Sequence, residues 1–356
     1  MSRIESSFVT GFPGFIAGQL VERLAAEHRR FSLLVQQNFI EFAKARIAAI
    51  AEKTGSSEKN FTLVVGDISV SGLGIPDEIR EAIAEETTDV FHLAAIYDLG
   101  VDKQLAYEVN VDGTRNINQF CKVLPRLRRY NYVSTCYVAG KRTGRILETE
   151  LVHQEGFRNH YEETKYLAEL EVEALKTEVP VTIVRPSVVI GDSKTGETAK
   201  YDGIYSLILY LRKAPRLLRL LNVGNYKVRL NLVPVDFVVD GLIALAEDDR
   251  AIGKTVALAD PEPLFTAELF DVLAREMTGK TSVARPPAWL VERSLMLPFS
   301  PRLTGLPHSG VPYFFISQHY DTAVADSILS GAGLACPRFS DYAGNIIDFV
   351  EKHPVL

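Results

Sequence analysis

The feature of this sequence that most constrains its fold is an alternation of short β-branched runs with longer helical patterns across its first half. The short runs stand in "SSFVTGF", "FSLLVQQ", "FTLVVGD", "DVFHLAA" and "RYNYVST", and segments such as "GFIAGQLVERLAAE" have apolar residues at helical spacing. This alternation is typical of a parallel sheet whose two faces are both covered by helices. We therefore predict a doubly wound α/β fold.

A glycine turn follows the first predicted strand in "VTGFPGFIAG". The strand runs into Gly11 and a helix opens near Gly14, so the first amide groups of the helix face outward, where a diphosphate binds well. Gly11 suits a tight turn, Gly14 lets a backbone approach phosphates, and Ala17 is small enough for close packing of helix and strand. The spacing alone also fits an ordinary turn, but its place on the first strand of the alternation favours a dinucleotide site.

The end of the second predicted strand bears on the choice of cofactor. An acidic residue there binds the adenosine ribose of NAD, whereas a basic residue accepts the extra phosphate of NADP. The strand ends "LLVQQN", which puts Gln36 and Gln37 at this position. The missing carboxylate favours NADP as the cofactor and leaves NAD open, and the candidate cations are Lys44 and Arg46 on the following helix.

The segments "YNYVSTCYVAGKRTGR" and "NHYEETKYLAELE" hold a candidate acid/base group. Tyr161 and Lys165 are four residues apart on a predicted helix, so their side chains share one face. A neighbouring ammonium favours the phenolate and is expected to lower the pKa of Tyr161 toward neutrality. Thr135 follows a strand that ends at the same sheet edge as the glycine turn, where its hydroxyl can bind a substrate carbonyl.

These motifs, in this order, resemble those of the extended short-chain dehydrogenase/reductases, which have a Rossmann fold. The matching segments are "TGFPGFIA", "GDIS", "FHLAA", "NVDGTRNI", "VSTCYVAG", "YEETK" and "RPSVVIGD". The resemblance implies catalytic roles for Thr135, Tyr161, Lys165 and Asn110. It also implies a cofactor site made of Thr10, Gly11, Phe12, Pro13, Gly14, Phe15, Ile16, Gln36, Asp67, Ile68, Ala94, Ala95, Lys165, Pro186, Ser187 and Val188.

Within that superfamily, "GDISVSGLGI" and "VTIVRPSVVIGDSKTGE" look most like the branch of thioester reductase domains and fatty acyl-CoA reductases. This likeness implies an NADPH-linked reductase of a carbonyl or acyl-thioester substrate, with Tyr161 as acid/base. Gln36 departs from the branch, which usually has an arginine there. Two alternatives stay open: a nucleotide-sugar epimerase or dehydratase on the same scaffold, and a non-catalytic NAD(P)-sensing protein.

The pattern changes to helices, Pro-rich loops and aromatic clusters in two later stretches of the chain. We predict that residues 1–190 and about 228–260 form the dinucleotide-binding domain, and that about 191–227 and 261–356 form a smaller, mostly helical substrate-binding lobe. The sheet is expected to continue past residue 150 through strands in "VPVTIVRPSVVIGD" and "VRLNLVPVDFVVDG". The lobe favours an apolar substrate, and the candidate residues for an acyl channel, or for lobe core, are Trp289, Phe299, Tyr313, Phe314 and Phe315.

Composition argues against several kinds of partner. A net charge of −6 without a long basic run argues against binding to nucleic acid. Three cysteines without metal-ligand spacing predict reduced thiols and no metal site. The first residues lack the apolar stretch of a secretory signal and no apolar run approaches the roughly 20 residues of a membrane span, so we expect a cytoplasmic protein. We expect a monomer or homodimer, and a Leu- and Arg-rich helix lying on a membrane surface stays an alternative to an enclosed channel.

Two conspicuous polar residues have structural interpretations. His92 in "VFHLAA" is expected to be a packed strand residue with a backbone partner. Asp236 in "VPVDFVVDG" precedes an apolar helical run and is expected to be its N-cap.

Overall fold

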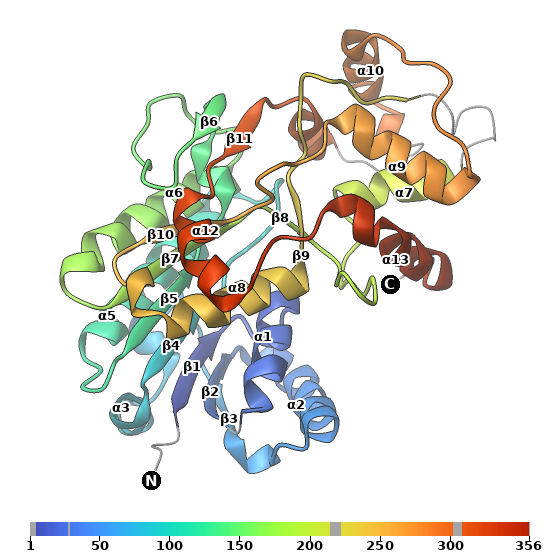
Figure 1. Cartoon of the computed structure of the whole chain (residues 1–356). Coiled ribbons are helices and arrows are strands. Elements are labelled where there is room, and N and C mark those ends of the chain that lie inside the picture. The colour runs from blue at the N-terminus through green and yellow to red at the C-terminus, as the bar shows by residue number, and fades with distance from the viewer. Residues whose placement is uncertain (1–4, 28, 214–221, 302–307, 356) are drawn as a thin grey trace.

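A parallel sheet of seven strands lies at the centre of the molecule, which a computed structural model describes at residues 5–27, 29–213, 222–301 and 308–355 (Figure 1). The strand order is β10-β7-β5-β4-β1-β2-β3, and each neighbouring pair is parallel. The strands are β1 Ser6–Thr10, β2 Arg30–Val35, β3 Phe61–Val65, β4 Asp89–His92, β5 Arg129–Val133, β7 Val181–Pro186 and β10 Thr255–Leu258. The predicted doubly wound α/β fold is confirmed.

The strand order reverses beside β1. The chain begins in the middle of the sheet, adds β2 and β3 on one side, and then crosses to β4 and the remaining strands on the other side. Loops that leave β1 and β4 therefore run apart, which opens a crevice at their carboxyl ends. This is the place where open α/β sheets bind their ligands.

Helices cover both faces of the sheet. One face carries α1 Phe15–Ala25, α2 Ile40–Thr54 and α8 Val235–Glu247, and the other carries α3 Asp77–Glu86, α5 Gly113–Lys122 and α6 His160–Glu173. Helix α4 Lys103–Tyr107 leads into α5 through a π-helical turn. Because successive strand residues point to opposite faces, Phe8 and Val9 of β1 belong to different core clusters.

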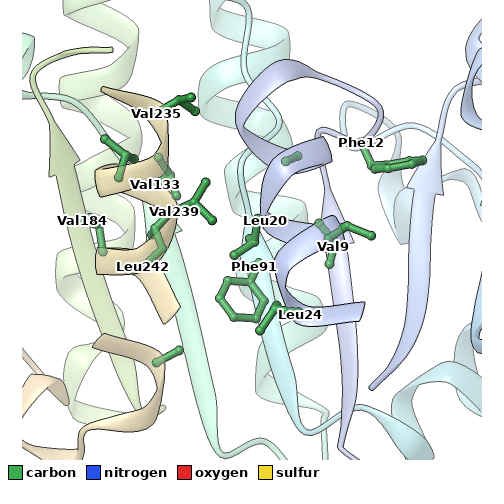
Figure 2. Packing of buried hydrophobic residues seen from close by; sticks show 14 of the residues in the cluster. Val9, Phe12, Leu20, Leu24, Phe91, Val133, Val184, Val235, Val239 and Leu242 are labelled. Carbon is green, nitrogen blue, oxygen red and sulfur yellow. The ribbon is translucent and has the colours of Figure 1, made fainter. Parts of the chain in front are cut away.

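The core under α1 and α8 is built from aliphatic and aromatic side chains of both helices and of the main sheet. Figure 2 shows Leu20 and Leu24 of α1 beside Val9 and Phe91 of the sheet. On the other side of this cluster, the side chains of α8 pack toward β5 and β7 through Val235, Val239, Leu242, Val133 and Val184. This packing fixes the N-terminal end of α1 over the crevice.

A third cluster of buried side chains lies in a helical lobe, which Figure 1 shows beside the sheet. Its helices are α7 Ile204–Lys213, α9 Thr266–Thr278 and α13 Phe339–Lys352, with α10 Ala288–Leu295 nearby. No helix in the described ranges is long and apolar enough to cross a bilayer.

The strand expected in "VRLNLVPVDFVVDG" does not extend the main sheet. It is β9 Leu232–Pro234, which pairs instead with β8 Val188–Ile190 in a separate two-stranded sheet. The main sheet ends with β10, whose short sequence carries no alternating pattern because it is buried at all four residues. The expected N-cap is also different: Pro234 occupies that position, and Asp236 accepts hydrogen bonds from the backbone and hydroxyl of Ser193.

The chain returns toward the main sheet between α10 and α13 of the helical lobe. Strand β11 Gln318–Tyr320 pairs with β6 Gly144–Ile146, and α12 Ala323–Leu329 packs in the same cluster as α8 and β10. The buried carboxylate of Glu148 accepts hydrogen bonds from the backbone amides of Ala257, at 2.7 Å, and Ala325, at 3.1 Å. The division of the chain into two domains at the predicted boundaries stays a prediction.

Candidate active site

A cavity of about 840 Å³ opens at the carboxyl edge of the main sheet. It is lined by residues at or just beyond the ends of six strands, including Thr10, Gln36, Gly66, Ala94, Thr135 and Ser187. Every residue predicted for the catalytic or cofactor site lines this cavity except Asn110. The topology therefore brings together residues that are separated in the sequence by up to about half the length of the chain.

The glycine turn has the geometry of a phosphate cradle. Gly11 has φ +88°, and a Cβ there would lie 2.8 Å from the backbone nitrogen of Ala94. A Cβ at Gly14 would lie 2.7 Å from the carbonyl oxygen of Gly11. Among the described residues no side chain caps the N-terminus of α1, so its first amides are left for a ligand. A dinucleotide diphosphate fits this turn, because both the open backbone and the positive end of the helix favour it.

The predicted adenosine end of the cavity contains a polar pair. The side-chain amide of Gln36 donates to Asp67 at 2.7 Å. Burial raises the pKa of Asp67, but hydrogen bonds from Ser69 and Gln36 lower it, and the resulting pKa is below the ordinary value. This carboxylate is therefore ionised at neutral pH and can accept from an adenine amino group.

Neither candidate cation for a 2′-phosphate lines the cavity. Lys44 pairs with Glu41 at 2.8 Å on its own helix, and Arg46 pairs with Glu22 of α1 at 3.2 Å. A 2′-phosphate would have to draw one of these side chains away from its carboxylate.

The predicted catalytic residues meet at the other end of the cavity. Tyr161 and Lys165 lie in α6, which begins after the N-cap Asn159, and Thr135 follows β5. These three of the four predicted catalytic side chains are buried, at 6%, 3% and 6% exposure for Tyr161, Lys165 and Thr135. The Thr135 hydroxyl lies near the Tyr161 phenol and accepts from the backbone amide of Tyr137 at 3.2 Å.

The expected lowering of the Tyr161 pKa is not found. Burial raises the pKa of Tyr161, and the nearby Thr135 hydroxyl offsets only part of that rise. The ammonium of Lys165 donates instead to the carbonyl of Val133 at 2.9 Å and to the hydroxyl of Tyr132 at 3.1 Å. Burial lowers the pKa of Lys165 to about 8, although Glu169 favours its charged form. The spacing of Tyr161 and Lys165 predicted their shared face but not the desolvation of both groups.

Asn110 lies outside the cavity wall. Its side-chain oxygen accepts from the backbone amide of Ile96 at 2.9 Å, and its amide donates to the hydroxyl of Thr164 at 3.0 Å. Asn110 therefore ties the loop after β4 to helix α6, in which Tyr161 and Lys165 lie.

His92 is a packed strand residue, as expected, but its partners are hydroxyls rather than the backbone. Its Nδ1 lies 2.7 Å from the oxygen of Thr10 and its Nε2 lies 3.1 Å from that of Thr114. Burial, with a contribution from the charge of Lys165, lowers the pKa of His92 to about 3.

Aromatic residues that the sequence did not single out form part of the cavity wall. The ring of Tyr97 stands edge-on to that of Tyr161, with centroids 5.2 Å apart, and Tyr137 lies next to Thr135. Both follow strands that end at the cavity, which is the signal that could have identified them. Phe39 and Phe42 line the cavity near Gln36.

The five aromatic residues proposed for an acyl channel lie elsewhere. None of Trp289, Phe299, Tyr313, Phe314 and Phe315 lines the cavity, and the first two are 65% and 55% exposed. The buried Tyr313 instead donates its hydroxyl to Glu162 at 2.6 Å and accepts from Asn159 at 2.7 Å. Within the described residues no group of three His, Cys, Asp or Glu side chains could hold a metal ion.

Comparison with known families and proteins gives consistent matches. A family model described as "Male sterility protein" matches residues 9–242. The fatty acyl-CoA reductase wat of Drosophila melanogaster is 28% identical over 278 residues, which cover 68% of this chain and 54% of the relative. The chloroplastic fatty acyl-CoA reductase 2 of Arabidopsis thaliana is 25% identical over 329 residues, with coverage of 72% and 52%. The chain thus spans about half the length of these relatives.

Solved structures share the whole architecture. The terminal R domain from the myxalamid PKS-NRPS biosynthetic pathway has a TM-score of 0.84 at 22% identity, over 100% of this chain and 92% of that one. A UDP-glucuronic acid 4-epimerase from Bacillus cereus, in complex with NAD, has a TM-score of 0.67 at 18% identity, with coverage of 98% and 99%. These similarities establish the fold.

Proposed function

Because this chain belongs to the male sterility protein family, we propose that it is an NAD(P)-dependent oxidoreductase which transfers hydride between nicotinamide and a carbonyl or acyl-thioester substrate. The predicted resemblance to extended short-chain dehydrogenase/reductases, and to their acyl-CoA reductase branch, is confirmed by the matches described above. The single observation that carries the proposal is the convergence of Thr135, Tyr161 and Lys165 with the glycine turn in one cavity.

Residues of the glycine turn are proposed to bind the cofactor. The backbone around Gly11 and Gly14, with the N-terminus of α1, would hold the diphosphate, and Asp67 would accept from the adenine. A bound nicotinamide dinucleotide supplies the hydride. Pro186, Ser187 and Val188 at the end of β7 are proposed to hold the nicotinamide end, next to Lys165.

Tyr161 is proposed to be the proton donor in the reducing direction. Burial keeps its phenol protonated at neutral pH, so a proton is available at the oxygen that faces the substrate carbonyl. The Thr135 hydroxyl lies near this phenol and would bind the same carbonyl oxygen. Two hydroxyls held in place before the reaction stabilise the charge that develops on that oxygen as hydride arrives.

Lys165 is proposed to act on Tyr161 electrostatically. Its ammonium lies one helical turn from the phenol in a site sheltered from water, where a positive charge stabilises the phenolate left after proton transfer. Donation to the nicotinamide ribose is proposed as its second role.

An acyl thioester is the proposed substrate class. Relatives of this chain are named fatty acyl-CoA reductases, and apolar and aromatic side chains prevail in the cavity wall around Tyr161. The wall there includes Tyr97, Ile96, Leu105 and Tyr137. A small-molecule substrate, a cytoplasmic location and a monomer or homodimer complete the proposal.

NADPH is the proposed cofactor. The neutral Gln36 does not repel a 2′-phosphate, and Arg46, which lies beside Gly18 of α1, is the proposed cation once it leaves Glu22. The test is the Kd of NADPH and NADH for the wild type, Arg46→Ala and the matched control Lys44→Ala. A weaker Kd for NADPH alone in Arg46→Ala supports the assignment, and equal Kd values for both cofactors in the wild type contradict it.

Turnover of Tyr161→Phe is the decisive experiment for the reductase. The oxidation of NADPH and NADH is followed against a panel of acyl-CoA esters, aldehydes and ketones. Loss of the phenol proton is expected to reduce kcat by about 10²-fold or more while the Kd of the dinucleotide is unchanged. Tyr166→Phe, on the same helix and also buried, is the control. Unchanged turnover in Tyr161→Phe would refute the role of this residue, and turnover of a nucleotide sugar instead of these substrates would favour the epimerase.

A further inference from the structure

The ammonium of Lys165 has a second tyrosine as its neighbour. Its Nζ donates to the hydroxyl of Tyr132 at 3.1 Å and lies 4.6 Å from the centre of that ring. The other acceptor is the backbone carbonyl of Val133, at 2.9 Å. Tyr132 lies in β5 under the cavity and is 1% exposed, so it touches Lys165 without lining the cavity itself.

A chain of buried hydrogen bonds fixes which atoms donate. Thr114 donates its own proton to the carbonyl of Asn110 at 2.7 Å, so toward Nε2 of His92 it accepts. Nε2 of His92 therefore carries a hydrogen and donates to the hydroxyl of Thr114. Nδ1 is then the acceptor of the neutral ring, and the Thr10 hydroxyl, which accepts from the amide of Ala94, donates to it.

The same reasoning sets the role of the Tyr132 hydroxyl. An ammonium has no lone pair, so Lys165 can only donate to the Tyr132 oxygen. The Tyr132 hydroxyl therefore accepts from Lys165, with the ring buried in β5. A phenol held in this way presents a fixed acceptor to the ammonium.

We propose that Tyr132 is a positioning residue for Lys165, which it holds beneath the reacting end of the cavity and keeps in the charged form. The effect of Tyr132 on turnover rests on the proposed function, whereas its effect on the charge of Lys165 does not. Tyr132 acts on the reaction through Lys165, whose charge in turn acts on Tyr161.

Few other charges stabilise the ammonium. The titratable groups that face Lys165 from its own helix and from the packed strands are Tyr161, Glu169, Tyr132 and His92. The charge of Glu169 is shared with the buried Arg185 at 2.6 Å and with the hydroxyl of Ser134. Burial lowers the pKa of Lys165 to about 8, so the loss of one of its two hydrogen-bond acceptors should change its charge within the working pH range.

The experiment measures the titration of Lys165 directly. Protein labelled with ¹³C at the lysine Cε position is titrated by NMR, and the Lys165 signal is assigned by its absence from Lys165→Met. The wild type is compared with Tyr132→Phe and with Tyr130→Phe, whose buried hydroxyl lies in the same strand but donates to Asn118 at 3.0 Å. The alkaline limb of kcat is then measured for the same proteins.

The expected result is a shift confined to one variant. Removal of a hydrogen bond to a charged group should lower the Lys165 midpoint in Tyr132→Phe by about one pH unit, and the alkaline limb of kcat should move with it. Tyr130→Phe should titrate like the wild type. If Tyr132→Phe does not reach a native circular dichroism spectrum and thermal transition, Tyr132→Met replaces it.

A midpoint in Tyr132→Phe that coincides with the wild type would overturn the proposal, and so would an equal shift in Tyr130→Phe. The titration does not require turnover. A wild-type protein that reduces no carbonyl compound would therefore refute the proposed function while the NMR result still decides the role of Tyr132.

Discussion

Replacement of His92 by Asn should change how stability depends on pH. His92 is fully buried between Thr10 and Thr114, and burial lowers its pKa to about 3 from an ordinary 6.5. The unfolded chain therefore binds a proton to this ring below pH 6.5, whereas the folded protein does not until about pH 3. Protonation of the unfolded state favours unfolding, so His92 costs the wild type stability as pH falls from 6.5 toward 3.

The size of the effect follows from that interval. Between pH 7 and pH 5 the unfolded ring goes from about one quarter protonated to almost fully protonated while the folded ring stays neutral, and a full proton is worth about 1.4 kcal/mol per pH unit. The wild type should lose about 2 kcal/mol from this group across that range. His92→Asn is expected to be less stable at pH 7 by about 1–3 kcal/mol because hydrogen bonds to Thr10 and Thr114 are lost, but its deficit should shrink by about 2 kcal/mol at pH 5.

Urea unfolding followed by circular dichroism at the two pH values measures both free energies of unfolding. Comparison of the wild type with the variant cancels the titration of other groups, which both proteins share. The same substitution at the more exposed His160, with a side chain 44% exposed, is the control. If the difference in free energy of unfolding between the wild type and His92→Asn is the same at pH 7 and at pH 5, the reasoning from burial is refuted.

Two further substitutions test the cavity and its support. Gly11→Ala should weaken dinucleotide binding at least tenfold, about 1.4 kcal/mol, because its Cβ would collide with Ala94. The control is Gly55→Ala, at a glycine with φ +72° and open space around it. The control should leave the dinucleotide Kd, measured by fluorescence titration, unchanged. Tyr313→Phe should cost about 1–3 kcal/mol in urea unfolding and reduce kcat, because the buried Glu162 next to Tyr161 loses a donor. Tyr342→Phe, whose buried hydroxyl has no partner in the described part of the chain, is its control, and equal losses in both would contradict this account.

The sheet and the convergence of the site residues could be predicted because both follow from short-range patterns. Alternating strands and helices place the ends of β1, β4 and β5 at one edge, and Thr10, Ala94 and Thr135 stand directly at those ends. The four-residue spacing of Tyr161 and Lys165 then puts both on one face of α6.

Properties that depend on the surroundings of a residue could not be predicted. The pKa of Tyr161 is raised because packing removes water from it, and no local pattern reports that burial. In the sequence, Tyr313 stands in an aromatic cluster of the kind that could line a channel. In the structure its hydroxyl instead donates to the carboxylate of Glu162 in helix α6, which is far away in the sequence. Strand β10 has only four residues and all are buried, so its sequence shows no alternation of apolar and polar side chains.

The contacts of Glu148 with the amides of Ala257 and Ala325 limit how this protein can be dissected or recombined. A chimera that takes everything from α9 onward from a relative would replace the segment that holds Ala325. A different backbone path there would leave the buried carboxyl group of Glu148 without one of its donors. Grafts intended to alter substrate range should therefore retain β11 and α12 with their native sheet, and join new material at positions before Gln318 and after Leu329.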